Sequence, residues 1–93
     1  GDHPITHVDL IKPDDLVLDV RSDAEYETDH IPGATPIPVE ELRERIRELP
    51  RDRRIVAYCK VGQRGYLATR MLRQEGFDVV NLSGGFTSYS RIG

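Results

Sequence analysis

Short, nearly continuous apolar runs occur at residues 16–20, 55–58 and 78–82, each bounded by polar residues. This pattern is typical of strands that are covered on both faces, so we expect all three in one sheet and the first two at its centre. Weaker runs at residues 5–8 and 35–37 are flanked by prolines. Because proline cannot donate a hydrogen bond to a strand ladder, we expect these two strands nearer the edges.

Two helices are expected between the strand at 16–20 and the strand at 55–58. The longer one carries apolar residues at intervals of three, four and three and ends at Pro50. Its apolar stripe consists of Val39, Leu42, Ile46 and Leu49. The shorter helix is expected around residues 24–27, because Ser22 is followed three residues later by Glu25, which is the spacing of a capping box.

A third helix is expected from residue 63 or 64 to residue 75. Gly76 then offers a left-handed C-terminal cap, and Phe77 can pack back on the helix. The buried face of this helix is expected to consist of Leu67, Ala68, Met71 and Leu72. Strand and helix signals thus alternate along the chain, which predicts an α/β fold with a mostly parallel central sheet, right-handed crossovers and helices on both faces.

The composition predicts one globular domain over residues 1–93, since 38% of the residues are apolar and no segment is of low complexity. The formal net charge is −3 and both signs are mixed along the chain, so nucleic acid is a poor candidate for a partner. No apolar run approaches the ~20 residues that span a bilayer, and the first residues lack the apolar core of a secretion signal. We therefore expect a cytoplasmic protein without a membrane segment.

Cys59 is the single cysteine, so it belongs either to the core or to chemistry in a reducing compartment. It follows the strand at 55–58 directly, and ligands of parallel α/β sheets bind at the carboxyl ends of the strands. The backbone N–H groups of the following loop can form an anion cradle, which Gly62 permits and to which Arg64 adds a cation. A buried cysteine is more often inert, but this loop favours a reactive thiolate.

Three segments resemble the signatures of rhodanese domains. Residues 59–64, Cys-Lys-Val-Gly-Gln-Arg, match the C-x-x-G-x-R persulfide loop. Upstream, Leu18-Asp19-Val20-Arg21 with Tyr26 and His30-Ile31-Pro32-Gly33-Ala34 resembles the first signature, and residues 81–86 with Tyr89 resemble the closing segment. The three segments stand in the same order as in the family and together cover nearly the whole chain. The resemblance implies a rhodanese-like three-layer fold.

The resemblance also implies sulfur transfer, in which the Cys59 thiolate takes a sulfane sulfur from a small donor and passes it to a thiol or to cyanide. No metal is implied. The loop residues implied to hold the persulfide are Lys60, Val61, Gly62, Gln63, Arg64 and Gly65. Asp19 and Arg21 resemble a supporting pair at the strand end, or else form an ordinary ion pair that anchors the loop. His30 is expected to be structural.

Arg64 has two interpretations. We favour a side chain that faces inward and contributes to the structure and the electric field of the loop; the alternative is a surface cation on the first turn of the helix.

The stretches 62–68 and 81–85 look most like the C-terminal rhodanese domains of flavin-dependent coenzyme A disulfide reductases. That likeness implies an excised domain whose partner domain carries FAD and uses NAD(P)H. A G-x-G-x-x-G fingerprint does not occur in this chain, so we expect no cofactor in it.

Two features depart from the family pattern, because Gly65 stands where many rhodaneses have Ser or Thr, and Asp29 where Gly is common. The missing hydroxyl at Gly65 suggests poor use of thiosulfate.

A cysteine-dependent phosphatase or arsenate reductase is a rival function. Those enzymes need five residues between Cys and Arg, whereas four residues lie between Cys59 and Arg64. A non-catalytic binding or regulatory module is a second rival, although such modules commonly lack the cysteine.

Overall fold

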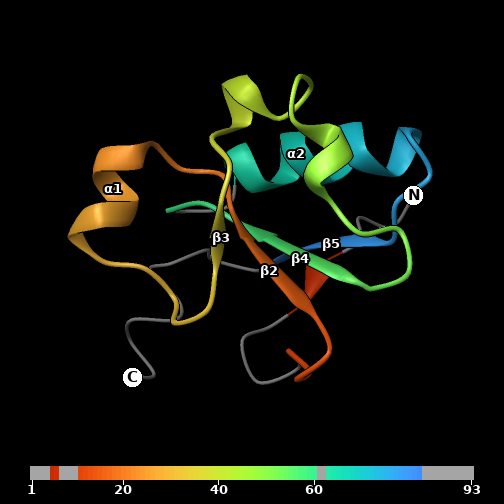
Figure 1. Cartoon of the computed structure of the whole chain (residues 1–93), viewed down its shortest axis with the longest axis horizontal. Coiled ribbons are helices and arrows are strands. Elements are labelled where there is room, and N and C mark those ends of the chain that lie inside the picture. The colour runs from red at the N-terminus through yellow and green to blue at the C-terminus, as the bar shows by residue number, and fades with distance from the viewer. Residues whose placement is uncertain (1–4, 7–10, 61–62, 83–93) are drawn as a thin grey trace.

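The computed structural model describes residues 5–6, 11–60 and 63–82. These residues form a five-stranded sheet in the order β1-β5-β4-β2-β3, and every neighbouring pair of strands is parallel (Figure 1). The strands are β1 Ile5–Thr6, β2 Leu16–Asp19, β3 Thr35–Pro36, β4 Ile55–Tyr58 and β5 Val79–Leu82. The parallel α/β fold is thus confirmed. β4 lies at the centre, and the two runs flanked by prolines form the edge strands, as expected.

One face of the sheet packs against helix α2 (Gln63–Gln74) and two short 3₁₀ helices, η2 (Val39–Glu41) and η3 (Ile46–Glu48), which lie above the sheet in Figure 1. This core includes the strand residues Leu18, Ile55, Ala57 and Val79, together with Val20 and Cys59, which directly follow β2 and β4. Strand residues alternate between the two faces, so their neighbours in sequence point to the other side.

The opposite face carries a second core around Val56, Tyr58 and Leu82. In the described part of the chain, Ile31 and Ala34 cover this face together with Tyr26 of the short helix α1 (Asp23–Thr28), which lies beside the sheet in Figure 1. The predicted capping box of α1 is present in both directions between Ser22 and Glu25.

The prediction of one regular helix across residues 39–49 is wrong. The stripe residues do turn toward the core, but η2 and η3 are separate 3₁₀ helices joined by turns. At their junction the backbone of Arg45, with φ −105° and ψ 14°, leaves the helical region. The spacing fits this arrangement, because the interval from Val39 to Leu42 and from Ile46 to Leu49 is three positions, which is one 3₁₀ turn each. The interval of four, from Leu42 to Ile46, lies in the connecting turn, where the Arg45 N–H donates to Glu41 O four positions earlier.

Helix α2 forms where the sequence predicts it, but its buried face is rotated from the predicted one. Leu67 is 56% exposed and Met71 is only partly buried. The buried residues are Gly65, Ala68, Thr69 and Leu72. The first turn of α2 turns Gly65 toward the sheet and packs close against it. A Cβ added at Gly65 would collide with the side-chain oxygen of Asn81 on β5.

The end of α2 follows the predicted glycine cap. Gly76 has φ +91°, its N–H donates to Arg73 O at 3.1 Å, and the Phe77 N–H donates to Leu72 O at 3.1 Å. This is the Schellman pattern, and it turns Phe77 into the core, where it is 4% exposed. The guanidinium of Arg51 lies 4.2 Å from the centre of the Phe77 ring and covers it.

Candidate functional site

Cys59 follows β4 directly, at the carboxyl end of the central strand. The residue is 1% exposed and belongs to the core on the α2 side of the sheet. Helix α2 begins at Gln63, so the thiol lies between the end of a buried strand and the start of the next helix. This placement agrees with the sequence prediction, and a helix N-terminus and nearby cations stabilise a thiolate.

The remaining loop residues differ in their surroundings. Lys60 and Gln63 are exposed, Arg64 is half-buried, and Gly65 is buried in the first turn of α2. Residues 61–62 lie outside the described part of the chain. The predicted cradle of backbone N–H groups over the sulfur therefore stays a prediction.

Arg64 is paired with Glu25 of α1, 39 residues earlier in the chain. Its Nη1 and Nη2 donate to Oε1 and Oε2 of the carboxylate at 2.9 and 3.1 Å. The hydrogen bonds to Arg64 are the largest cause that lowers the pKa of Glu25, to about 2, so the carboxylate is charged at neutral pH. Glu25 in turn raises the pKa of Arg64, and a smaller contribution comes from the charge on Cys59. Arg64 thus joins α1 to α2 within electrostatic reach of the sulfur.

Sequence reasoning named Glu25 only as a helix cap and missed its contact with the loop. The pairing needs the end of β2 and the start of α2 to be adjacent in space. Helix α1 follows β2, α2 follows β4, and the two strands are neighbours in the sheet. A local sequence pattern carries no such information, so the signal could come only from the strand order.

Asp19 and Arg21 form a buried pair, with the two side chains 0% and 5% exposed. Arg21 Nη2 lies 2.9 Å from Asp19 Oδ2 and also donates to the backbone oxygen of Asp29 at 2.6 Å. The Tyr58 hydroxyl donates to Asp19 Oδ2 at 2.7 Å and accepts from the N–H of Ile31 at 3.2 Å. Burial, followed by the bond to Asp19, raises the pKa of this phenol.

This network lies on the other face of the sheet from Cys59. Asp19 is in register with Tyr58, and Tyr58 belongs to the second core, whereas Cys59 belongs to the core under α2. The structure therefore does not bring Asp19 and Arg21 to the sulfur. Their bonds fix the carboxyl ends of β2 and β4, from which the Cys59 loop departs.

His30 lies in the turn between α1 and β3. Its Nδ1 is 2.8 Å from the backbone oxygen of Tyr26, and the two rings stack at 3.8 Å. The Tyr26 hydroxyl donates to Ala34 O at 3.1 Å, which closes the turn in which Gly33 has φ +83°. These contacts give His30 a structural place, as the sequence analysis expects.

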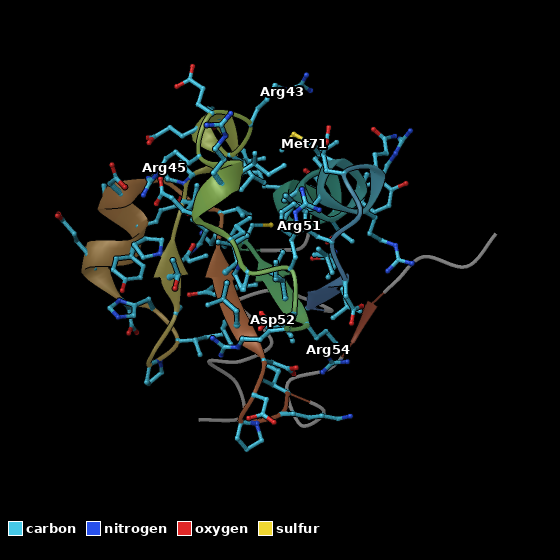
Figure 2. All side chains as sticks on the ribbon, turned by 45° about the vertical axis from the view of Figure 1, so that its right-hand side comes forward. Arg43, Arg45, Arg51, Asp52, Arg54 and Met71 are labelled. Carbon is cyan, nitrogen blue, oxygen red and sulfur yellow. The ribbon has the colours of Figure 1, made fainter. Side chains whose placement is uncertain are left out.

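Two surface hollows of about 510 and 440 Å³ lie at the amino ends of β2 and β4. Both are lined by Lys12, Asp15 and Arg53, and Asp15 pairs with Arg54 at 2.6 Å. Figure 2 shows Arg54 in the lower half of the molecule, away from Arg43 and Met71 near the top. None of the residues that line these hollows belongs to the loop after Cys59, so neither is the expected sulfur site.

The sheet order, the cysteine at the end of β4 and the loop that leads to Arg64 define a rhodanese-type α/β domain. The family model of the Rhodanese-like domain matches residues 6–92. The chain therefore belongs to the rhodanese-like family.

A sulfurtransferase of Allochromatium vinosum is 40% identical over 81 residues, which are 86% of this chain and 76% of that protein. The structure of reduced Bacillus anthracis CoADR-RHD is 35% identical with a TM-score of 0.90, over 97% of this chain and 17% of that one. An NAD-dependent persulfide reductase from A. fulgidus is 39% identical with a TM-score of 0.77, over 90% of this chain and 15% of that one. Similar domains thus occur both in short proteins and as small parts of long ones.

Proposed function

We propose that this domain is a sulfurtransferase that carries sulfane sulfur as a persulfide on Cys59. The observation that carries the proposal is the position of Cys59 at the carboxyl end of β4, in the connection to α2 and within electrostatic reach of Arg64. The family supports the same class of reaction, since a relative of similar length is named a sulfurtransferase.

The reaction has two balanced halves. The Cys59 thiolate attacks the outer sulfur of a donor such as thiosulfate, a new S–S bond forms, the donor's own S–S bond breaks, and sulfite leaves with the bonding pair. A thiolate or cyanide then attacks the outer sulfur of the Cys59 persulfide. The acceptor gains the sulfur as a persulfide or as thiocyanate, and the Cys59 thiolate is restored. Positive groups near the sulfur stabilise the negative charge in both halves.

We further propose that the domain works beside a reductase domain that carries FAD and uses NAD(P)H. Support comes from the two reductase structures in which a similar domain makes up 17% and 15% of the chain. The flavin and nicotinamide would bind to that partner domain, since the sequence of this chain has no dinucleotide fingerprint. A single cysteine cannot form an internal disulfide, and sulfur carried on it suits a reducing compartment such as the cytoplasm.

The test is the intact mass of the protein after incubation with thiosulfate, polysulfide or coenzyme A persulfide, recorded without reductant. Cys59→Ser is the matched control, because it changes one buried atom of the site. A mass gain of one sulfur on the parent protein alone, discharged by cyanide or a thiol, is the expected result. No gain with any donor would overturn the proposal and favour a binding or regulatory module.

The phosphatase alternative has less support. The spacing of four residues between Cys59 and Arg64 is too short for the loop that encircles a tetrahedral oxyanion. Both terminal nitrogens of Arg64 also donate to Glu25, whose negative charge opposes an incoming phosphate. Turnover of an aryl phosphate that disappears in Cys59→Ser would reverse this conclusion.

A further inference from the structure

The carboxylate of Glu25 is held in place from two sides. On one side, the backbone N–H and the hydroxyl of Ser22 lie 3.1 and 3.0 Å from Oε1, within the capping box of α1. On the other side, Oε1 and Oε2 each accept one terminal N–H of Arg64. Because the cap fixes Glu25 independently of the loop, the carboxylate determines where the guanidinium of Arg64 lies.

This pairing changes what the loop offers to an anion. An arginine attracts small anions most strongly when both terminal nitrogens are available to form a fork. Here Glu25 accepts one N–H from each terminal nitrogen, so this fork is already in use, and its negative charge offsets the positive charge of Arg64. The two side chains are 34% and 32% exposed, so water screens the pair only in part.

We propose that Glu25 is a specificity-determining residue that acts through Arg64 and disfavours small dianionic sulfur donors. By neutralising Arg64, a cation within electrostatic reach of Cys59, it removes the attraction that would favour a second negative charge on the donor. Donors with a single negative charge are then preferred over thiosulfate. Glu25 does not touch the sulfur and is a positioning residue. The inference rests on the proposed sulfur transfer.

Two sulfur donors that react in the same way but differ in net charge test the effect of donor charge alone. Thiosulfate carries two negative charges and releases sulfite, whereas methanethiosulfonate carries one and releases methanesulfinate. In each case the Cys59 thiolate takes the outer sulfur and the leaving group keeps the bonding pair. The quantity to measure is the ratio of kcat/KM for thiosulfate to kcat/KM for methanethiosulfonate, with cyanide as the acceptor.

Glu25→Gln is the test variant, because the amide oxygen can still accept from Ser22 and from one N–H of Arg64 while the charge is lost. Glu48→Gln is the matched control, since it removes the same charge from an exposed pair with Arg45, at 2.8 Å on η3. We expect Glu25→Gln to raise the ratio about three- to fivefold and Glu48→Gln to change it less than about 1.5-fold, because one extra charge interacts across a partly screened site.

A second measurement needs no variant. In the parent protein the neutral pair predicts a ratio that changes less than about twofold between ionic strengths of ~0.01 and ~0.15 M, whereas a free Arg64 would give a steep fall. A ratio unchanged or lowered in Glu25→Gln, or a steep fall with salt in the parent protein, would overturn the inference while leaving sulfur transfer intact. If the parent protein forms no persulfide with either donor, the proposed function and the inference both fail.

Discussion

The hydroxyl of Tyr58 donates a hydrogen bond of 2.7 Å to the buried carboxylate of Asp19, across the neighbouring strands β4 and β2. The next residue after Tyr58 is Cys59, whose side chain points to the opposite face. The N–H of Val20 donates to the Tyr58 backbone oxygen at 3.0 Å, so the two strand ends are joined within the sheet plane as well as on one of its faces. The bonds on one face therefore determine the position of the sulfur on the other.

Replacement of Tyr58 by phenylalanine is expected to lower the free energy of unfolding by about 2 kcal/mol, because a buried carboxylate loses a donor and the Ile31 N–H loses its acceptor. Tyr26→Phe is the matched control, since it removes a bond to a neutral carbonyl in a partly buried place and should cost about 1 kcal/mol or less. Urea unfolding measures both variants. Equal losses of unfolding free energy in the two variants would mean that the hydrogen bond to Asp19 stabilises the fold no more than an ordinary bond to a carbonyl.

Gly65→Ala is expected to cost about 1–3 kcal/mol of stability, because the added Cβ would collide with the side-chain oxygen of Asn81. Gly65→Ser meets the same obstacle, so a hydroxyl placed there should not by itself improve the use of thiosulfate. The double variant Gly65→Ala with Asn81→Ala is the control. It should recover part of the loss relative to the sum of the two single variants, and strict additivity in thermal unfolding would count against the close contact.

The strands and the place of Cys59 follow from local sequence features. Runs such as 55–58 are apolar at every position, which distinguishes a strand covered on both faces, and Pro36 marks an edge. Cys59 could be placed because it follows its strand without an intervening residue. The glycine cap of α2 is equally local, since a positive φ at Gly76 needs a residue without a side chain.

Other features depend on distances across the sheet and could not be predicted. Asp19 was placed near the reactive end of its strand, but only the register with Tyr58 shows that it points away from the sulfur. The rotation of α2 depends on the contact between Gly65 and Asn81, which are distant in sequence. The 3₁₀ helices share the apolar spacing of a regular helix, so hydrophobic periodicity alone could not separate the two.

Leu67 and Leu72 provide a direct test of how α2 faces the sheet. Leu67 is 56% exposed, so Leu67→Ala should change the free energy of unfolding by less than about 0.5 kcal/mol. Leu72 is 0% exposed, and Leu72→Ala should cost about 2–5 kcal/mol because it leaves a cavity in the core. The helix remains the same in both variants, so urea unfolding compares burial alone. Comparable losses of unfolding free energy in the two variants would mean that Leu67 is buried, as the sequence predicts.

The ion pair of Glu25 predicts how stability depends on pH. Hydrogen bonds from Arg64 lower the pKa of Glu25 from 4.5 to about 2 in the folded protein. A lowered pKa means that the unfolded chain binds the proton first, so the stabilisation is complete above about pH 4.5 and is lost as the pH falls toward 2. The difference in unfolding free energy between the parent protein and Glu25→Gln should therefore be constant near neutral pH and shrink below pH 4.5.

Glu27→Gln is the control for this experiment, because Glu27 is an exposed carboxylate on the same helix and its loss gives the same net charge. Urea unfolding of the three proteins at successive pH values gives the comparison. If Glu25→Gln and Glu27→Gln follow the same curve, general charge explains the acid response and the pair with Arg64 does not. If only Glu25→Gln converges with the parent protein in acid, the contact that joins α1 to the loop helix persists in solution.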